Sequence, residues 1–175
     1  MDEKELLDVV DESDVVIQRG VPRSEVHAKN YIHRAVMIFV FNKKGQIFVQ
    51  QRSNTKDRYP GLWMASASGH VRSGESYDAA AVRELKEELG ISVSAKRLER
   101  VCDFDVMEPI EREQDVLYVL DEFDGEIKLD RQEVLTGKWM SINELRKEIV
   151  KDEKKWTPPF LTAWKLWMAK TKKGV

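Results

Sequence analysis

The chain has 175 residues, of which 42% are hydrophobic and 34% charged, and its formal net charge is −2. This length can bury one good core, and no linker, repeat or low-complexity stretch divides it, so we expect a single domain over residues 1–175. A net charge near zero gives no global basic field that would attract nucleic acid. The lone Cys102 excludes a disulfide framework or a thiolate zinc site, and no apolar run is long enough to span a membrane.

The first half of the chain predicts two hairpins. Residues 6–10 and 15–18 are apolar segments separated by a polar turn, which is typical of a hairpin. A second, stronger hairpin is predicted from the β-branched and aromatic run 33–41, through a turn that contains Gly, to residues 46–51. Residues 1–30 are therefore expected to form an N-terminal hairpin and loop extension.

A helix of about four turns is predicted over residues 76–89, which lack Pro and Gly and end at Gly90. At the helical period, Glu84, Glu87 and Glu88 share one side of it. Three carboxylates held that close raise one another's pKa unless a cation neutralises them, and Mg²⁺ or Mn²⁺ prefers such oxygen ligands. The same run, taken alone, is also typical of a solvated acidic helix face. The residues expected to face the core are Ala81, Val82, Leu85 and Leu89.

The loop before this helix, residues 66–75, is rich in Ser, Gly and Ala. Small residues allow backbone amides and carbonyls to approach a metal or phosphate oxygens closely. Loop and helix together therefore predict one cradle, which favours a metal site over a solvated face.

Nine positions of this cradle have a fixed spacing: Gly69, Glu75, Arg83, Glu84, Leu85, Glu87, Glu88, Gly90 and Ile91. They resemble a complete Nudix box over residues 69–91, the signature of hydrolases that cleave a nucleoside diphosphate linked to another group, X. The resemblance implies that Glu84, Glu87 and Glu88 are metal ligands, and that Glu84 or a carboxylate outside the box activates the attacking water. It also implies that Glu75 pairs with Arg83 to fix the loop against the helix. Bound metal lowers the pKa of the water and offsets the charge of the diphosphate.

The second half of the chain mixes further strands and helices. Strands are predicted at 101–106, 116–120 and 137–140, and helices at 142–150 and 160–171. This mixture predicts an α/β fold, although periodicity alone does not separate a sandwich from other arrangements. The Nudix resemblance implies an α/β/α sandwich with a mixed central sheet.

A second resemblance covers nearly the whole chain. Segments 7–12, 23–27, 33–36, 51–53, 56–63 and 68–71 are similar to the isopentenyl-diphosphate isomerase-like branch of Nudix proteins. The isomerase has a second metal site of three histidines and two acidic residues, and the resemblance implies His27, His33, His70, Glu113 and Asp115 for it here. Such a mixed set suits Zn²⁺ or Mn²⁺, but the three histidines are equally typical of hydrogen-bonded strand and loop residues.

Three features depart from the isomerase. Its catalytic Cys is replaced by Ser68, the Trp near its C-terminus is replaced by Pro159, and its degraded Nudix box is here intact. A serine hydroxyl is a poor proton donor and acceptor beside a thiol, so alkene protonation loses a participant while hydrolysis keeps all of its own. We therefore predict a hydrolase, with the isomerase or a non-catalytic diphosphate-binding module as the alternatives.

Further substrate contacts are expected outside the helix. Arg52 and Lys56 match the positions at which this branch grips a diphosphate, although loop cations are often simply solvated. Ser68 and Gly69 are expected to contact the substrate from the small-residue loop. Tyr59 could stack on a base, whereas the five tryptophans are expected to pack in the core.

The predicted activity is Mg²⁺- or Mn²⁺-dependent cleavage of a diphosphate bond in a small-molecule substrate, nucleotide-like or other. No nucleic acid or membrane partner is expected, because the basic tail at 165–173 is typical of a solvated helix end. The acidic start at residues 1–5 excludes a signal peptide, so a cytoplasmic location is expected.

Overall fold

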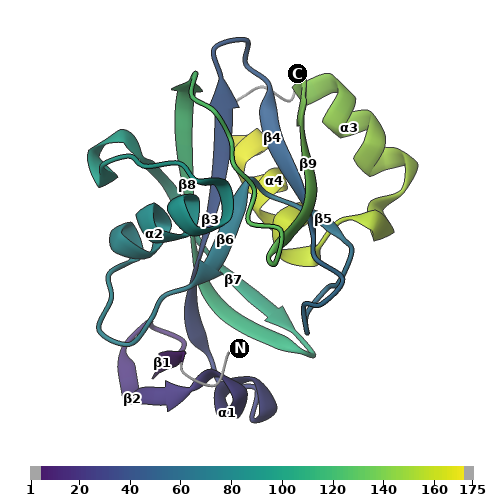
Figure 1. Cartoon of the computed structure of the whole chain (residues 1–175). Helices are drawn as coiled ribbons and strands as arrows, with labels where there is room; N and C mark the ends of the chain where they lie inside the picture. Colours follow the sequence, from purple (N-terminus) through teal and green to yellow (C-terminus); the bar gives the residue numbers. More distant parts are fainter. Residues whose placement is uncertain (1–4, 172–175) are drawn as a thin grey trace.

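The computed structural model describes residues 5–171, which form a mixed sheet of nine strands with helices on both faces (Figure 1). The strands are β1 (Leu6–Val10), β2 (Val16–Pro22), β3 (His33–Asn42), β4 (Ile47–Arg52), β5 (Trp63–Met64), β6 (Ala67–His70), β7 (Glu99–Glu108), β8 (Glu111–Phe123) and β9 (Val134–Met140). The helices are α1 (Arg23–Ala28), α2 (Tyr77–Leu89), α3 (Ile142–Lys151) and α4 (Pro158–Thr171), with the short 3₁₀ helices η1 (Ala95–Arg97) and η2 (Glu153–Lys155). None of the described helices has the length and apolar character needed to cross a membrane.

Strand β3 organises the sheet. Along one edge it pairs with β8, which runs parallel to it from the pair His33 and Glu113 onward. Along its other edge it pairs in turn with β1, β6 and β4, all antiparallel. The sheet is therefore mixed, and the end of β3 that begins at His33 lies beside residues from several distant parts of the chain.

Each face of the sheet has its own core, because successive residues of a strand point to opposite faces. Ile38 and Val40 of β3 pack with Leu85 of α2 on one face. Phe39 points to the other face and packs against Trp164 of α4, with ring centroids 6.3 Å apart. In Figure 1, α2 and α4 accordingly lie on opposite sides of the strands. This layering confirms the predicted α/β/α sandwich with a mixed central sheet.

Helix α2 begins and ends where the sequence predicts. Ser76 caps its start, since its hydroxyl accepts a hydrogen bond of 3.2 Å from the main-chain N–H of Ala79. Gly90 ends it with φ +67°, a left-handed conformation that favours glycine. One core assignment differs: Val82 is only partly buried, and Ala80 is buried in its place. These two ends fix the position of α2, and therefore of its glutamates, over the sheet.

The N-terminal hairpin is present as β1 and β2, but the chain continues as α1 instead of a loop. Val26 of this short helix is fully buried against Leu7 and Val9. The other predicted strands and helices each overlap an observed element, whereas the short strands β5 and β6 were not predicted. Residues 1–4 of the acidic start and 172–173 of the basic tail lie outside the described residues.

Candidate active site

Two carboxylates of α2 turn inward toward the loop that precedes the helix. Glu84 is 8% exposed and Glu88 is 6% exposed. Glu84 packs so closely on Gly69 that a Cβ at that position would lie 2.2 Å from the Glu84 carboxyl carbon. Glu88 accepts hydrogen bonds from Gln50 Nε2 at 2.6 Å and from the Ser68 main-chain N–H at 3.3 Å. The small residues of the loop therefore allow both carboxylates to lie against the main chain of β6.

The environment of these two carboxylates disfavours their charge. Burial raises the pKa of Glu84 to about 8, and the neighbouring Glu88 adds to the shift while Arg83 opposes it. Burial also raises the pKa of Glu88 to about 7, opposed by its hydrogen bond from Gln50 and by the positive charge of Arg52. A cation bound between them would neutralise this pair, and Mg²⁺ and Mn²⁺ prefer carboxylate oxygens. The donor set fits the metal that the sequence predicts.

A divalent cation is expected to stabilise the protein more strongly at high pH. Because the pKa values of Glu84 and Glu88 lie above their ordinary value of 4.5, the cation-free folded state binds protons more tightly than the unfolded state. The stability that these groups contribute is therefore fully present below pH 4.5 and is lost as the pH rises through about 7 and about 8. A cation binds the ionised carboxylates, so the rise in melting temperature caused by saturating Mg²⁺ should be near zero at about pH 5 and several degrees at about pH 9.

Differential scanning fluorimetry over a pH series, with and without Mg²⁺ or Mn²⁺, measures this effect. The variant Glu88→Gln should lose most of the pH-dependent shift, because it keeps the size of the side chain and removes one titrating group. A cation-induced shift of equal size at all pH values, or one unchanged in Glu88→Gln, would mean that the cation binds elsewhere.

Arg83 ties the loop to the helix. Its guanidinium donates to both carboxylate oxygens of Glu75, at 2.9 and 2.8 Å, and to the main-chain carbonyl of His70 at 2.8 Å. It also contacts Glu84, and it donates to Glu87 at 3.1 Å. Glu87 differs from the other two box carboxylates, since its side chain is 45% exposed and also pairs with Arg72. The expected pair of Glu75 and Arg83 is present.

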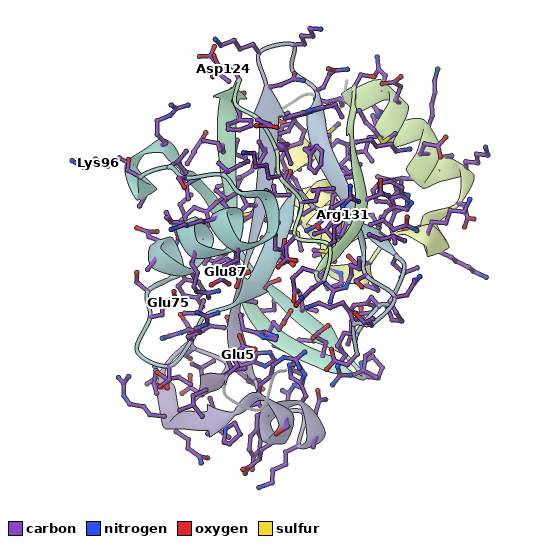
Figure 2. All side chains as sticks on the ribbon, in the orientation of Figure 1. Glu5, Glu75, Glu87, Lys96, Asp124 and Arg131 are labelled. Atoms are coloured by element: carbon purple, nitrogen blue, oxygen red, sulfur yellow. The ribbon has the colours of Figure 1, made fainter. Side chains whose placement is uncertain are left out.

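The box carboxylates open into a cavity of about 790 Å³, a volume that suits a small-molecule ligand. In Figure 2, Glu75 and Glu87 lie toward α2 and Glu5 lies nearer the N-terminal hairpin. The charged side chains that line it include Glu5, Arg23, Arg52, Lys56, Arg58, His70, Arg72, Glu84, Glu87, Glu88, Glu111, Glu113, Asp115, Asp130 and Glu133. Carboxylates and cations thus share one cavity, as a site for a metal and a diphosphate requires.

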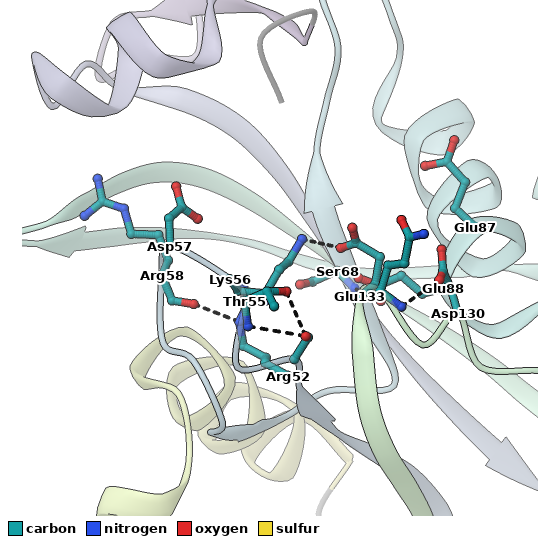
Figure 3. A network of polar contacts seen from close by, with 12 residues as sticks. Arg52, Thr55, Lys56, Asp57, Arg58, Ser68, Glu87, Glu88, Asp130 and Glu133 are labelled. Atoms are coloured by element: carbon teal, nitrogen blue, oxygen red, sulfur yellow. Dashed lines mark hydrogen bonds and ion pairs between the residues drawn. The ribbon is translucent and has the colours of Figure 1, made fainter. Parts of the chain in front are cut away.

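Arg52 and Lys56 enter this cavity from the end of β4 and the loop after it (Figure 3). Arg52 donates to the main-chain carbonyl of Arg58 at 3.0 Å and to the sulfur of Met64 at 3.3 Å. Within residues 5–171 no carboxylate pairs with Arg52, so its charge is uncommitted. Lys56 is paired with Glu133. Both predicted substrate-binding cations therefore lie in the cavity. Among the described residues Arg52 has no acidic partner, whereas Lys56 forms an ion pair with Glu133.

The three histidines converge from α1, β3 and β6. Their ring centroids lie 5.2 Å apart for His27 and His33, 5.0 Å for His27 and His70, and 4.9 Å for His33 and His70. One ring nitrogen from each lies within 4.8 Å of those of the others.

Several ring nitrogens in this cluster are buried without a hydrogen-bond partner: both nitrogens of His27 and Nε2 of His33. His33 Nδ1 lies 3.0 Å from the Tyr31 carbonyl, and His33 Nε2 lies 3.4 Å from a carboxylate oxygen of Glu113. Burial and the neighbouring positive groups lower the pKa of His27 to about 3, so its ring is neutral. Burial also lowers the pKa of His70, whereas Glu113 raises the pKa of His33 against the effect of burial. Imidazole nitrogens in their neutral form fit a metal such as Zn²⁺ or Mn²⁺.

The acidic part of this second cluster differs from the prediction. Glu113 lies 3.4 Å from His33 and 3.6 Å from His70, as expected. The second carboxylate is Glu111, which forms a group with His70 and Glu113 whose donor atoms lie within 4.8 Å of one another. Asp115 belongs to neither group of potential ligands among the described residues, although it lines the cavity. Alternate residues of β8 point to one face, so Glu111, Glu113 and Asp115 share a face, and the ion-binding geometry groups Glu111 rather than Asp115 with Glu113.

Some residues of the site carried no signal that singled them out. Gln50 lies in an apolar strand, and its burial beside Glu88 is not apparent from the sequence. Asp130 and Glu133 line the cavity from the segment before β9, which resembles any polar loop in the sequence. These residues reach the cavity only because β4 and β9 pair beside α2, which the sequence does not indicate.

Comparisons with known proteins agree with this architecture. A model of the NUDIX domain family matches residues 31–160. The chain is 37% identical over 166 residues to the isopentenyl-diphosphate Delta-isomerase of Serratia proteamaculans, an alignment that covers 92% of this chain and 90% of that protein. It is 35% identical over 153 residues to an uncharacterised Nudix hydrolase of Clostridium acetobutylicum, covering 82% of this chain and 73% of that protein.

Solved structures show the same arrangement of elements. DR0079 from Deinococcus radiodurans superimposes with a TM-score of 0.73 at 26% identity, over 85% of this chain and 90% of that chain. The MutT protein from Methanosarcina mazei superimposes with a TM-score of 0.66 over 81% of this chain and 96% of that chain. At 19% identity the second likeness concerns the fold alone.

Proposed function

This chain belongs to the Nudix family, in its isopentenyl-diphosphate isomerase-like branch, and on that premise we propose that it is a metal-dependent hydrolase of a diphosphate bond in a small nucleotide-like or other diphosphate–X substrate. The observation that carries this proposal is the burial of Glu84 and Glu88 against Ser68 and Gly69 of β6, in the same cavity as the uncommitted Arg52. A complete set of acidic ligands beside a free cation suits cleavage of a bound diphosphate better than binding alone.

We assign the roles as follows. Glu84, Glu87 and Glu88 would hold Mg²⁺ or Mn²⁺, which when bound lowers the pKa of water and offsets the charge on the diphosphate. Glu84, or a carboxylate outside the box such as Glu133, accepts the proton of the attacking water.

The remaining residues bind and position. The Arg52 guanidinium donates to phosphate oxygens, Lys56 exchanges its pairing with Glu133 for the substrate, and main-chain groups of Ser68 and Gly69 border the reacting phosphate. Glu75 and Arg83 keep the loop in register with α2. We further propose one Nudix domain over residues 1–175, a cytoplasmic location and no nucleic-acid partner.

The proposal is tested by incubating the purified protein with Mg²⁺ or Mn²⁺ and a panel of diphosphates. The panel contains nucleoside di- and triphosphates, dinucleotides, nucleotide sugars and isopentenyl diphosphate. Release of phosphate or a monophosphate from at least one member, dependent on the divalent cation, is the expected result. Tight binding of panel members with no turnover would instead support a non-catalytic diphosphate-binding module.

The isomerase is the second candidate, because relatives named isopentenyl-diphosphate Delta-isomerase align with nearly the whole chain and the histidine cluster has ring nitrogens free for a metal. Ser68 argues against it, since a serine hydroxyl lines the cavity where the isomerase has its thiol, and Pro159 lines it in place of the Trp. We expect no interconversion of isopentenyl and dimethylallyl diphosphate at an enzymatic rate. Proton NMR in deuterated buffer follows the exchange, and deuterium incorporation as fast as hydrolysis would reverse this ranking.

A further inference from the structure

The loop between β4 and β5 holds Tyr59 in a conformation that a side chain rarely adopts. Its φ is +48°, in the left-handed region, and it precedes Pro60, before which extended backbone is favoured. Hydrogen bonds fix the loop around it, from the Leu62 N–H to the Tyr59 carbonyl at 3.3 Å and from Gln51 Nε2 to the Gly61 carbonyl at 2.8 Å. Backbone strain of this kind persists where the surrounding structure enforces it, and it is concentrated at functional sites.

The hydroxyl of Tyr59 is buried and has no hydrogen-bond partner. Tyr59 also lines the cavity that contains the box carboxylates. A buried hydroxyl without a partner destabilises the folded protein unless something else accepts its hydrogen bond. The unpaired hydroxyl of Tyr59 therefore lowers the stability of the folded protein, and a bound ligand could supply the missing hydrogen-bond acceptor.

The charges around Tyr59 make it a donor. Burial and the nearby carboxylates, above all Glu111, raise the pKa of its hydroxyl, so it stays protonated. Its neighbour Arg58 lines the same cavity, and within residues 5–171 the guanidinium of Arg58 makes no hydrogen bond or ion pair. In Figure 3 the Arg58 side chain points away from Arg52. Two adjacent donors therefore line the same cavity.

Two other roles for Tyr59, packing and base stacking, do not explain its buried and unpaired hydroxyl. Simple packing would leave the hydroxyl at the surface or bonded, whereas here it is buried and alone. Stacking of a base between two large rings is not provided for, because Tyr59 is the one Phe, Tyr or Trp among the described residues that line the cavity. Trp63 is engaged elsewhere, with Lys138 over its ring at 4.8 Å and Trp156 at 6.1 Å.

We propose that Tyr59 is a specificity residue whose hydroxyl donates a hydrogen bond to group X, and that X is a hydroxyl-bearing group such as a sugar. A hydroxylated X can accept hydrogen bonds from Tyr59 and Arg58, which a hydrocarbon X cannot do. This inference rests on the proposed function, since it places X beside the diphosphate that the box and Arg52 bind. It places X at the wall of the cavity that Tyr59 and Arg58 line, and the phosphates at the wall that α2 lines.

The test compares wild-type protein with Tyr59→Phe, which keeps the ring and removes only the hydroxyl. Calorimetric titration in Mg²⁺ uses three non-hydrolysable probes: methylenediphosphonate, its ribosyl ester and its isopentenyl ester. We expect Tyr59→Phe to weaken the ribosyl ester about 10-fold or more, a loss typical of a hydrogen bond to a substrate, and to leave the other two probes unchanged. The melting temperature of the free variant should be unchanged or higher, because an unpaired hydroxyl has been removed.

Tyr31→Phe is the matched control, since Tyr31 packs against the N-terminal cluster and does not line the cavity. Equal affinities of wild type and Tyr59→Phe for the ribosyl ester would overturn the proposal. An equal loss for all three probes would assign Tyr59 to the diphosphate instead, and a ribosyl ester that binds no more tightly than methylenediphosphonate would show that the site does not recognise a hydroxylated X. Because these probes are not cleaved, a chain that hydrolyses nothing in the panel can still show the Tyr59 effect, and the two proposals fail separately.

Discussion

Replacing Glu88 by Gln is expected to lower divalent-dependent turnover by on the order of 100-fold or more, with the fold intact. Glu88 is 6% exposed, and its carboxylate is held by Gln50 and by the main chain of Ser68. Gln keeps the size of the side chain but removes the anionic charge that a cation requires. Glu87→Gln is expected to lose a comparable factor, because Glu87 is the third acidic ligand of the proposed site.

Steady-state kinetics at saturating Mg²⁺ and Mn²⁺ measure these losses, and circular dichroism checks the fold. Glu99→Gln serves as the matched control, since Glu99 is an exposed carboxylate of β7 that does not line the cavity. Near wild-type rates in both Glu87→Gln and Glu88→Gln would place the metal site elsewhere.

Adding a single methyl group at Gly69, in the variant Gly69→Ala, is expected to damage the site severely. Its Cβ would lie 2.2 Å from the Glu84 carboxyl carbon, so the carboxylate must leave its position. A displacement of a reacting group by about 1 Å can cost about 100-fold in rate, and overpacking costs about 1 to 3 kcal/mol in stability. We therefore expect Gly69→Ala to lose turnover by about 100-fold and to melt at a lower temperature than wild type.

A double variant separates the clash from other effects of the substitution. In Gly69→Ala with Glu84→Ala the carboxylate is gone, so the melting temperature should recover while activity stays lost. Thermal unfolding of the two single variants and the double variant gives the coupling between the residues. Additive losses in stability would show that Gly69 does not contact Glu84, and full activity in Gly69→Ala would remove Glu84 from the site.

The local parts of the fold were predictable because their signals lie close together in the sequence. The start and end of α2 follow from a run of helix formers between Ser76 and Gly90, and the hairpin of β3 and β4 follows from apolar runs around a Gly turn. The family resemblance implied the pair of Glu75 and Arg83 and a cluster of the three histidines, and in the structure these side chains lie close together.

The rest depended on contacts between distant segments. Parallel pairing of β3 and β8 sets which carboxylate faces the histidines, and no local pattern distinguishes Glu111 from Asp115. Helix α1 is too short to show a helical period, and its stability comes from Val26 packing on β1. Burial of Glu88 beside Gln50 likewise exists only once β4 lies under α2. Pairing of that kind is a property of the folded sheet, which single-sequence patterns do not contain.

The central claim is that water attacks a phosphorus atom of a bound diphosphate, and hydrolysis in water enriched with oxygen-18 tests it most directly. Phosphorus-31 NMR resolves products that carry the heavy isotope, using the member of the diphosphate panel that is cleaved fastest. The account predicts one heavy oxygen in one of the two phosphorylated products and none in the other, with no reaction when the divalent cation is removed. Products that contain no heavy oxygen on phosphorus, or no cleavage of any panel member with Mg²⁺ or Mn²⁺ present, would contradict it.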